Sequence, residues 1–290
     1  MEIKKVAVIG AGVMGHGIAQ VAAQVAKFDV VMLSRSLSTL EKAMGMIKDS
    51  LQKFHKKGLL TEDQVKETLG RIHTMPLSDL ERAVSDADLI IETIAEDIES
   101  KKDVLLQVSK AAKPESIITT NTSSISITEL ASLISRPERF CGMHFFNPPQ
   151  LMKLVEVIKG ARTSDETINI VAEVAKKMGK EPVIVKKDCA GFIVNRILMA
   201  ALNEALNLFW EGIAERDDID KACELGLNWP MGPLKLLDYI GLDTALAILE
   251  VLEKELGPRF KPNQVLKQMV RAGFLGRKTG RGFYEWPQPA

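Results

Sequence analysis

The sequence predicts an α/β domain with a mainly parallel sheet and a helical-hairpin insertion, followed by an all-α C-terminal domain. Three observations lead to this fold class. A glycine motif separates an apolar run from a helical stretch, strand-like and helix-like segments then alternate, and from Gly191 onward only helical spacing continues. Such alternation is typical of a parallel sheet with helices on both faces. We therefore expect a first domain at 1–187 and a second at 188–290.

Residues 1–33 predict a strand, a turn, a helix and a second strand. The run IKKVAVI at 3–9 is apolar and β-branched, residues 13–26 are good helix formers, and FDVVML at 28–33 is again strand-like. The turn between the first strand and the helix is GAGVMG, at 10–15. This order of elements is the context in which a glycine motif binds a dinucleotide.

Each glycine of the motif has a separate role. Gly10 allows a tight turn, Gly12 lets a pyrophosphate approach the backbone, and Gly15 lets the helix pack closely on the strand. Val13 and Met14 complete the turn at the helix N-terminus, whose free N–H groups favour an anion. A tight turn in a glycine-tolerant loop is the alternative, but the context favours a Rossmann-like dinucleotide-binding domain.

The segment at 37–71 predicts two helices where a crossover needs only one. Its apolar residues recur with helical spacing, and KKGLLTED interrupts them. Gly58 is typical of a helix C-terminus, and Thr61 with Gln64 is typical of a capping box that begins the next helix. We therefore expect a helical hairpin that projects from the sheet.

The remaining elements follow from apolar periodicity. Further strands are expected at 71–75, 88–94, 116–123, 140–146, 154–159 and 182–187, with a helix at 99–112. The second domain is expected to contain helices at 192–212, 217–226, 232–256 and 263–272.

Composition argues against several classes of protein. The 290 residues carry a formal net charge of zero, so no general attraction to nucleic acid or membrane surfaces is expected. The apolar runs are too short to span a membrane, and the N-terminus lacks a signal-peptide pattern. The three cysteines lack metal-binding spacing, so we expect free thiols, no metal site and a cytoplasmic location.

The stretch HFFNPPQLMKLVE at 144–156 predicts a His–Glu pair. Two prolines interrupt an apolar strand, and a hairpin centred on Gln150 would place His144 opposite Glu156. Opposed residues of an antiparallel pair share a face, with Cβ atoms roughly 5 Å apart. The carboxylate could then hold one imidazole nitrogen and leave the other for proton transfer. A core histidine is the alternative, but a buried glutamate needs a partner.

A dinucleotide site with such a pair suggests the oxidation of an alcohol, in which a nicotinamide takes the hydride and the histidine takes the proton. Seven motifs lie along the chain: GAGVMG, NTSS at 121–124, HFFNP at 144–148, MKLVEVI at 152–158, GFIVNR at 191–196, PMGPLKLLD at 230–238 and GRKTGRGFY at 276–284. Together they resemble the 3-hydroxyacyl-CoA dehydrogenases, in particular the short bacterial 3-hydroxybutyryl-CoA dehydrogenases. The chain departs from that pattern at Ala190, where a proline is usual, which would loosen the domain junction.

The resemblance implies roles for individual residues. The catalytic residues would be His144 as general base, Glu156 as its partner, and Ser123 and Asn195, which would also bind substrate. Further cofactor contacts would come from Glu96, Lys101, Asn147 and Lys278, and contacts to coenzyme A from Ser50 and Lys57. The alternatives are a helix cap for Ser123, a polar helix start for Asn195, a surface ion pair for Glu96 and Lys101, and a solvated lysine-rich face on the hairpin.

The resemblance also implies a substrate and an assembly. The substrate would be an acyl-CoA with a short chain, such as acetoacetyl-CoA or 3-hydroxybutyryl-CoA. The helical domain would form a homodimer interface, although its apolar segments could also be buried within the domain itself. Two other functions stay open: a dehydrogenase of a free hydroxy acid, and a dinucleotide-binding protein without turnover.

Ser34 and Arg35 bear on the choice of cofactor. They follow the second strand, where NAD-binding proteins usually have an acidic residue that bonds the ribose hydroxyls. Serine removes the repulsion of a 2′-phosphate, and an adjacent arginine can bind a phosphate with two hydrogen bonds. The cofactor is NADP(H) or NAD(H), and these two residues favour NADP(H). The alternative is that Arg35 faces solvent or stacks on adenine while NAD(H) is used.

Overall fold

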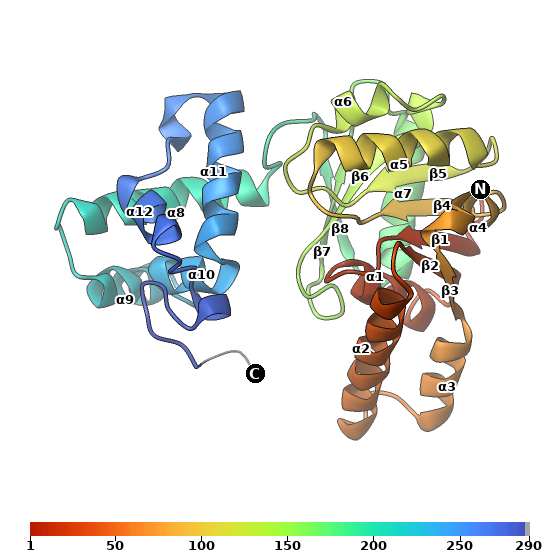
Figure 1. Ribbon diagram of the computed structural model, residues 1–290, viewed down its shortest axis with the longest axis horizontal. Coiled ribbons are helices and arrows are strands. Elements are labelled where there is room, and N and C mark those ends of the chain that lie inside the picture. The colour runs from red at the N-terminus through yellow and green to blue at the C-terminus, as the bar shows by residue number, and fades with distance from the viewer. Residues whose placement is uncertain (288–290) are drawn as a thin grey trace. The chain divides into compact units, whose positions relative to one another are not determined.

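The computed structural model describes residues 1–287 and divides into two compact units, Met1–Cys189 and Ala190–Ala290. The division follows Cys189, whereas the sequence analysis places the boundary after residue 187. Figure 1 labels the elements of both units, and each unit is described by itself.

An eight-stranded sheet forms the centre of the first unit, in the order β3-β2-β1-β4-β5-β6-β7-β8. Neighbouring strands are parallel except β6 and β7, which pair antiparallel, so the predicted mainly parallel sheet is confirmed. The strands are β1 Lys5–Ile9, β2 Asp29–Ser34, β3 Ile72–Pro76, β4 Leu89–Glu92, β5 Ile117–Thr120, β6 Phe140–Phe145, β7 Leu154–Ile158 and β8 Glu181–Val185. The strand order reverses at β1, which creates a crevice at the carboxyl ends of β1 and β4.

Helices cover both faces of this sheet (Figure 1). The helices of this unit are α1 Gly15–Gln24, α2 Leu37–Lys56, α3 Glu62–Gly70, α4 Leu80–Val84, α5 Ile98–Ala111, α6 Ile127–Ala131 and α7 Asp165–Lys177. On one face, Val6 and Val8 of β1 pack in a single buried cluster with Ile18 of α1, Ile47 of α2 and Val171 of α7. This burial of apolar area is the main force that holds the layers together.

The sequence analysis does not include α4 and α7. The signal for α7 is nevertheless present in the chain. The Ser164 hydroxyl caps the helix by accepting a hydrogen bond from the Thr167 N–H at 3.1 Å, and Ile168, Val171 and Val174 recur with helical spacing and are buried. Two strands flank this helix in sequence, so α7 completes a crossover between β7 and β8, which are parallel neighbours.

The predicted helical hairpin consists of α2 and α3, which extend away from the sheet in Figure 1. Its capping box is present. The Thr61 hydroxyl accepts from the Gln64 N–H at 3.2 Å, and the Gln64 side chain accepts from the Thr61 N–H at 2.8 Å. Two N–H groups that the helix leaves without a partner are thereby satisfied.

We expect Thr61→Ala to lower the free energy of unfolding by about 1 kcal/mol, because one of these N–H groups loses its acceptor. Urea denaturation of the whole chain measures this loss. Lys66→Ala, an exposed substitution in the same helix, is the matched control and should change stability by less than about 0.5 kcal/mol. Equal losses in the two variants would contradict the importance of the cap.

The second unit is built from helices around its own buried core. They are α8 Val194–Trp210, α9 Arg216–Gly226, α10 Pro233–Ile240, α11 Leu242–Leu256 and α12 Gln264–Arg271. The all-α character is confirmed for the described part of this unit, but the single helix expected at 232–256 is wrong. Gly241 has φ of 99°, which no helix allows, and this glycine separates α10 from α11. Of the helices within residues 1–287, none has the length and apolar character needed to cross a bilayer.

Candidate active site

The glycine turn after β1 needs glycine at two of its positions, Gly10 and Gly15, and is open at Gly12. A Cβ on Gly10, whose φ is 109°, would lie 2.7 Å from the backbone oxygen of Thr93. A Cβ on Gly15 would lie 1.8 Å from the backbone oxygen of Gly10, so a side chain there would force α1 away from the strand. A Cβ on Gly12 would meet nothing within 4 Å. Gly12 is therefore the open side of the turn, where an anionic group fits against the helix N-terminus.

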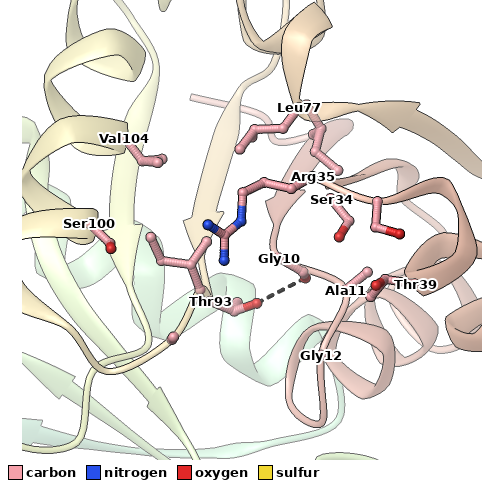
Figure 2. Close-up of a pocket in the computed structure, with 14 residues that line it drawn as sticks. Gly10, Ala11, Gly12, Ser34, Arg35, Thr39, Leu77, Thr93, Ser100 and Val104 are labelled. Atoms are coloured by element: carbon pink, nitrogen blue, oxygen red, sulfur yellow. Dashed lines mark hydrogen bonds between the residues drawn. The ribbon is translucent and has the colours of Figure 1, made fainter.

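A cavity of about 360 Å³ lies beside this turn, at the carboxyl ends of β1, β2 and β4. Figure 2 shows the side chains that surround it. They are Gly10, Ala11, Gly12, Leu33, Ser34, Arg35, Ser36, Thr39, Leu77, Thr93, Ile94, Ala95, Ser100 and Val104. Its position at the reversal of strand order is the one where open α/β sheets bind dinucleotides. The residues present thus fit a nucleotide cofactor, because they combine the glycine turn with hydroxyl groups, an arginine and apolar side chains.

Ser34 and Arg35 both line the cavity. Ser34 is the last residue of β2 and pairs with Pro76 of β3, so the strand ends one residue later than the predicted end at residue 33. Figure 2 shows the Arg35 guanidinium group extended into the cavity, toward Thr93. Within residues 1–287 no carboxylate forms an ion pair with Arg35, so its charge is available to a bound anion. Ser36 adds a hydroxyl, which lies 2.7 Å from the Ser38 hydroxyl.

His144 and Glu156 face each other across the β6–β7 hairpin, in the register predicted from the sequence. The His144 Nδ1 lies 2.8 Å from the Glu156 Oε2. Only 5% of His144 and none of Glu156 is exposed. The electrostatic interaction between the two side chains is therefore stronger than it would be in water. The ring of Phe146 lies 4.6 Å from the imidazole, centroid to centroid. The carboxylate can therefore fix the tautomer and orientation of the imidazole.

Glu96 organises the turn that carries Ser123. Its Oε1 accepts hydrogen bonds from the Thr122 hydroxyl at 2.5 Å and from the Ser123 and Ser124 N–H groups at 2.9 and 3.1 Å. Partial burial opposes the charge, but the Lys101 ammonium and these hydrogen bonds outweigh it and hold the pKa of the Glu96 carboxyl below its usual range. The helix-cap alternative for Ser123 is wrong, because Ser126 caps α6 by accepting from the Glu129 N–H.

Lys101 is not among the residues that line the nucleotide cavity, and its contact with the cofactor stays a prediction. It is 1% exposed, and its ammonium group lies 2.8 Å from the fully buried carboxylate of Glu92 and 3.6 Å from Glu96. From α5, Ser100 and Val104 line the cavity instead. The sequence analysis missed Glu92, whose carboxylate also accepts from the Thr120 hydroxyl at 2.6 Å. An acidic residue inside the apolar strand DLIIETI was the available signal, because a buried carboxylate needs a cation.

The other expected site residues lie in four separate parts of the chain. Asn147 is exposed and directly follows β6 and Phe146. Ser50 is half-buried on α2, and Lys57 is exposed at the C-terminus of that helix, on the hairpin. Asn195 and Lys278 belong to the second unit, where Asn195 lies in the first turn of α8 and Lys278 forms an ion pair with Asp243.

A glycine turn at the reversal of a parallel sheet, with a histidine and a glutamate in contact near the same strand ends, is an arrangement typical of dinucleotide-dependent oxidoreductases. The comparisons with known proteins define the family. Residues 5–189 match the NAD-binding domain of 3-hydroxyacyl-CoA dehydrogenase, and residues 191–286 match its C-terminal domain. The chain therefore belongs to the 3-hydroxyacyl-CoA dehydrogenase family, a family of oxidoreductases with a nicotinamide cofactor.

Individual relatives match over nearly the whole chain. A probable 3-hydroxybutyryl-CoA dehydrogenase of Deinococcus radiodurans is 52% identical over 97% of this chain and 100% of its own length. The 3-hydroxybutyryl-CoA dehydrogenase of Bradyrhizobium diazoefficiens is 46% identical over 98% of this chain and 96% of its own length. The crystal structure of (S)-3-hydroxybutyryl-CoA dehydrogenase from Ralstonia eutropha matches with a TM-score of 0.94 and 43% identity, over 99% of this chain and 100% of that one.

Proposed function

We propose that this chain interconverts 3-hydroxybutyryl-CoA and acetoacetyl-CoA, with His144 and Glu156 as the acid–base pair. The names of the relatives, which match at 46–52% identity over nearly full length, support the substrate. The 2.8 Å contact between His144 Nδ1 and Glu156 supports the chemistry and is the observation that carries this proposal. When bound, the nicotinamide accepts or donates the hydride at the substrate carbon C3.

The protein supplies the proton transfer. Because Glu156 holds Nδ1 of His144, we assign the exchange of the proton with the substrate oxygen to Nε2. In the oxidation, the imidazole takes the proton of the 3-hydroxyl group as C3 becomes a carbonyl, and Glu156 stabilises the imidazolium ion that forms. In the reduction, the imidazolium ion returns the proton to the oxygen. The burial of the pair limits the access of water to these two side chains.

Other residues bind and orient the substrate in this proposal. Ser123, whose turn is fixed by Glu96, would donate a hydrogen bond to the substrate oxygen, and Asn195 would bind it from the second unit. Ser50 and the basic end of α2 at Lys57 would contact the coenzyme A moiety. Asn147 and Lys278 would contact the cofactor, and the second unit would form a homodimer interface, as the family resemblance implies.

NADP(H) is the cofactor that we propose, because Ser34 and Arg35 line the nucleotide cavity and the Arg35 guanidinium group extends into it. An acidic residue at Ser34 would repel a 2′-phosphate, and the serine does not. Use of NAD(H), with Arg35 stacked on the adenine, is the competing assignment.

The test is the initial rate of acetoacetyl-CoA reduction at several concentrations of NADPH and, separately, of NADH. We expect turnover with both and a higher kcat/KM with NADPH. A higher value with NADH would keep the reaction and contradict the phosphate site. Acetoacetate without coenzyme A is the control substrate, and equal kcat/KM for both substrates would favour a dehydrogenase of free hydroxy acids. Absence of turnover with either cofactor would contradict the proposed reaction.

A further inference from the structure

Lys180 is a buried lysine that the proposed reaction does not use. It lies between the C-terminus of α7 and the first residue of β8, and only 6% of it is exposed. Its ammonium group donates hydrogen bonds to the backbone oxygens of Pro149 and Met152, the latter at 2.8 Å. Both acceptors belong to the loop 146–153, which joins β6 to β7.

The charge of Lys180 has an unusual environment. In the part of the chain that the structure describes, no carboxylate lies within ion-pair distance of its ammonium group, unlike that of Lys101. Burial lowers the pKa of Lys180, since two neutral carbonyl groups replace water only in part. A buried ammonium group without a carboxylate partner lowers the stability of the folded protein. Charged groups in such environments are concentrated at functional sites.

The loop 146–153 links the parts of the proposed site. It connects the strand of His144 to the strand of Glu156 and carries Asn147. A second contact holds this loop at Gln150, whose amide donates a hydrogen bond to the Gln20 side chain at 3.3 Å. Gln20 lies on α1, the helix that begins at the glycine turn. Lys180 holds the loop from the β8 side, and Gln150 ties it to the dinucleotide-binding helix.

We propose that Lys180 is a positioning residue of the active site: through the carbonyl groups of Pro149 and Met152, it fixes the loop that joins His144 to Glu156. The proposal rests on the catalytic role proposed above for His144. Lys180 itself contacts neither the imidazole of His144 nor the substrate in this proposal. It holds the hairpin in the geometry in which the imidazole meets the substrate oxygen and Asn147 meets the cofactor, and small errors in such geometry slow reactions strongly.

The experiment compares Lys180→Met, Lys180→Arg and Lys180→Gln with the wild-type chain, each at full length. Lys177→Met, an exposed lysine near the end of α7, is the matched control. The measurements are kcat and KM for acetoacetyl-CoA, the kinetic isotope effect with reduced cofactor deuterated at C4, and the melting temperature. The isotope effect is informative because a structural role alone does not change which step limits the rate.

We expect Lys180→Met to lower kcat by about tenfold or more and to increase the isotope effect on kcat, because the hydride step becomes slower than product release. Its melting temperature should fall by a few degrees, because the buried carbonyl group of Pro149 loses its donor, whereas that of Met152 lies in an exposed part of the loop and can bind water. Lys180→Arg keeps a cationic donor and should recover part of kcat. Lys177→Met should behave as the wild type.

Three results would overturn the inference. An unchanged kcat in Lys180→Met is the first. The second is a loss of activity that matches the loss of folded protein, with an unchanged isotope effect. If Lys180→Met does not fold, Lys180→Gln replaces it. Its amide nitrogen is uncharged and one bond closer to the backbone than the lysine ammonium, so it should not hold both carbonyl groups, and wild-type values of kcat and isotope effect there would be the third. A wild-type chain without turnover would instead refute the proposed reaction, and the role of Lys180 with it.

Discussion

His144→Ala should lower kcat for acetoacetyl-CoA reduction by about a thousandfold, the middle of the range for loss of a general acid–base group. The substrate oxygen would then have to take its proton from water. Cofactor affinity, measured by fluorescence titration of NADPH, should change less than about twofold, because His144 lies on β6 and is not among the residues that line the nucleotide cavity.

The control for this prediction is His73→Ala. His73 is exposed on β3, away from the β6–β7 hairpin, and its replacement should leave kcat unchanged. Normal activity of His144→Ala, with intact folding, would remove the histidine from the mechanism. A loss of cofactor affinity as large as the loss of kcat would show that the substitution disturbs the sheet rather than the proton transfer.

Glu156→Gln tests the contribution of the partner carboxylate separately from that of the base, His144. The amide keeps the shape of the side chain but gives up the charge that stabilises an imidazolium ion. We expect a smaller loss of kcat than in His144→Ala, because the imidazole itself remains. Because the proposed mechanism has His144 and Glu156 act as one unit, the double variant should lose little more than His144→Ala alone. Additive losses would mean that the two residues act independently.

The His–Glu pair could be predicted from the sequence because it depends on local geometry. Two prolines break one apolar strand, and a hairpin has a fixed side-chain period of two, so opposite residues follow from the centre of the turn. The capping box at Thr61 is equally local, since both of its hydrogen bonds link residues three apart. The sheet with its parallel strands follows from the alternation of elements, which leaves few topologies open.

Contacts that are distant in sequence, or that involve only the backbone, could not be predicted in this way. Lys180 bonds carbonyl oxygens in a loop 28 and 31 residues earlier, and a carbonyl oxygen gives no residue type to recognise. The burial of Lys101 depends on how α5 packs on the sheet. The helix break at Gly241 is a different case, because a glycine within a helical pattern can mark the end of a helix. The apolar periodicity continues across this glycine, so periodicity alone predicts one uninterrupted helix.

The choice of nucleotide is the second large effect that we expect. Arg35→Ala should lower kcat/KM with NADPH by about 10- to 100-fold, the loss of about 1.5–3 kcal/mol from hydrogen bonds to a charged group. The value with NADH should change little, since NADH lacks the 2′-phosphate. Arg35→Lys keeps the charge without the two-pronged geometry and should lie between the wild type and Arg35→Ala.

Binding measurements test the same site without catalysis. Titration of each variant with NADPH and NADH gives the two dissociation constants, and the preference for NADPH should weaken as salt rises, because an exposed charge pair is screened. When Ser34→Asp is combined with Arg35→Ala, the new carboxylate should repel the 2′-phosphate and accept hydrogen bonds from the ribose hydroxyls. This double variant should therefore prefer NADH. If Arg35→Ala instead weakens both cofactors equally, the guanidinium group acts on the adenine that they share. Its position in the nucleotide cavity would then contribute to affinity for either cofactor and not to discrimination between them.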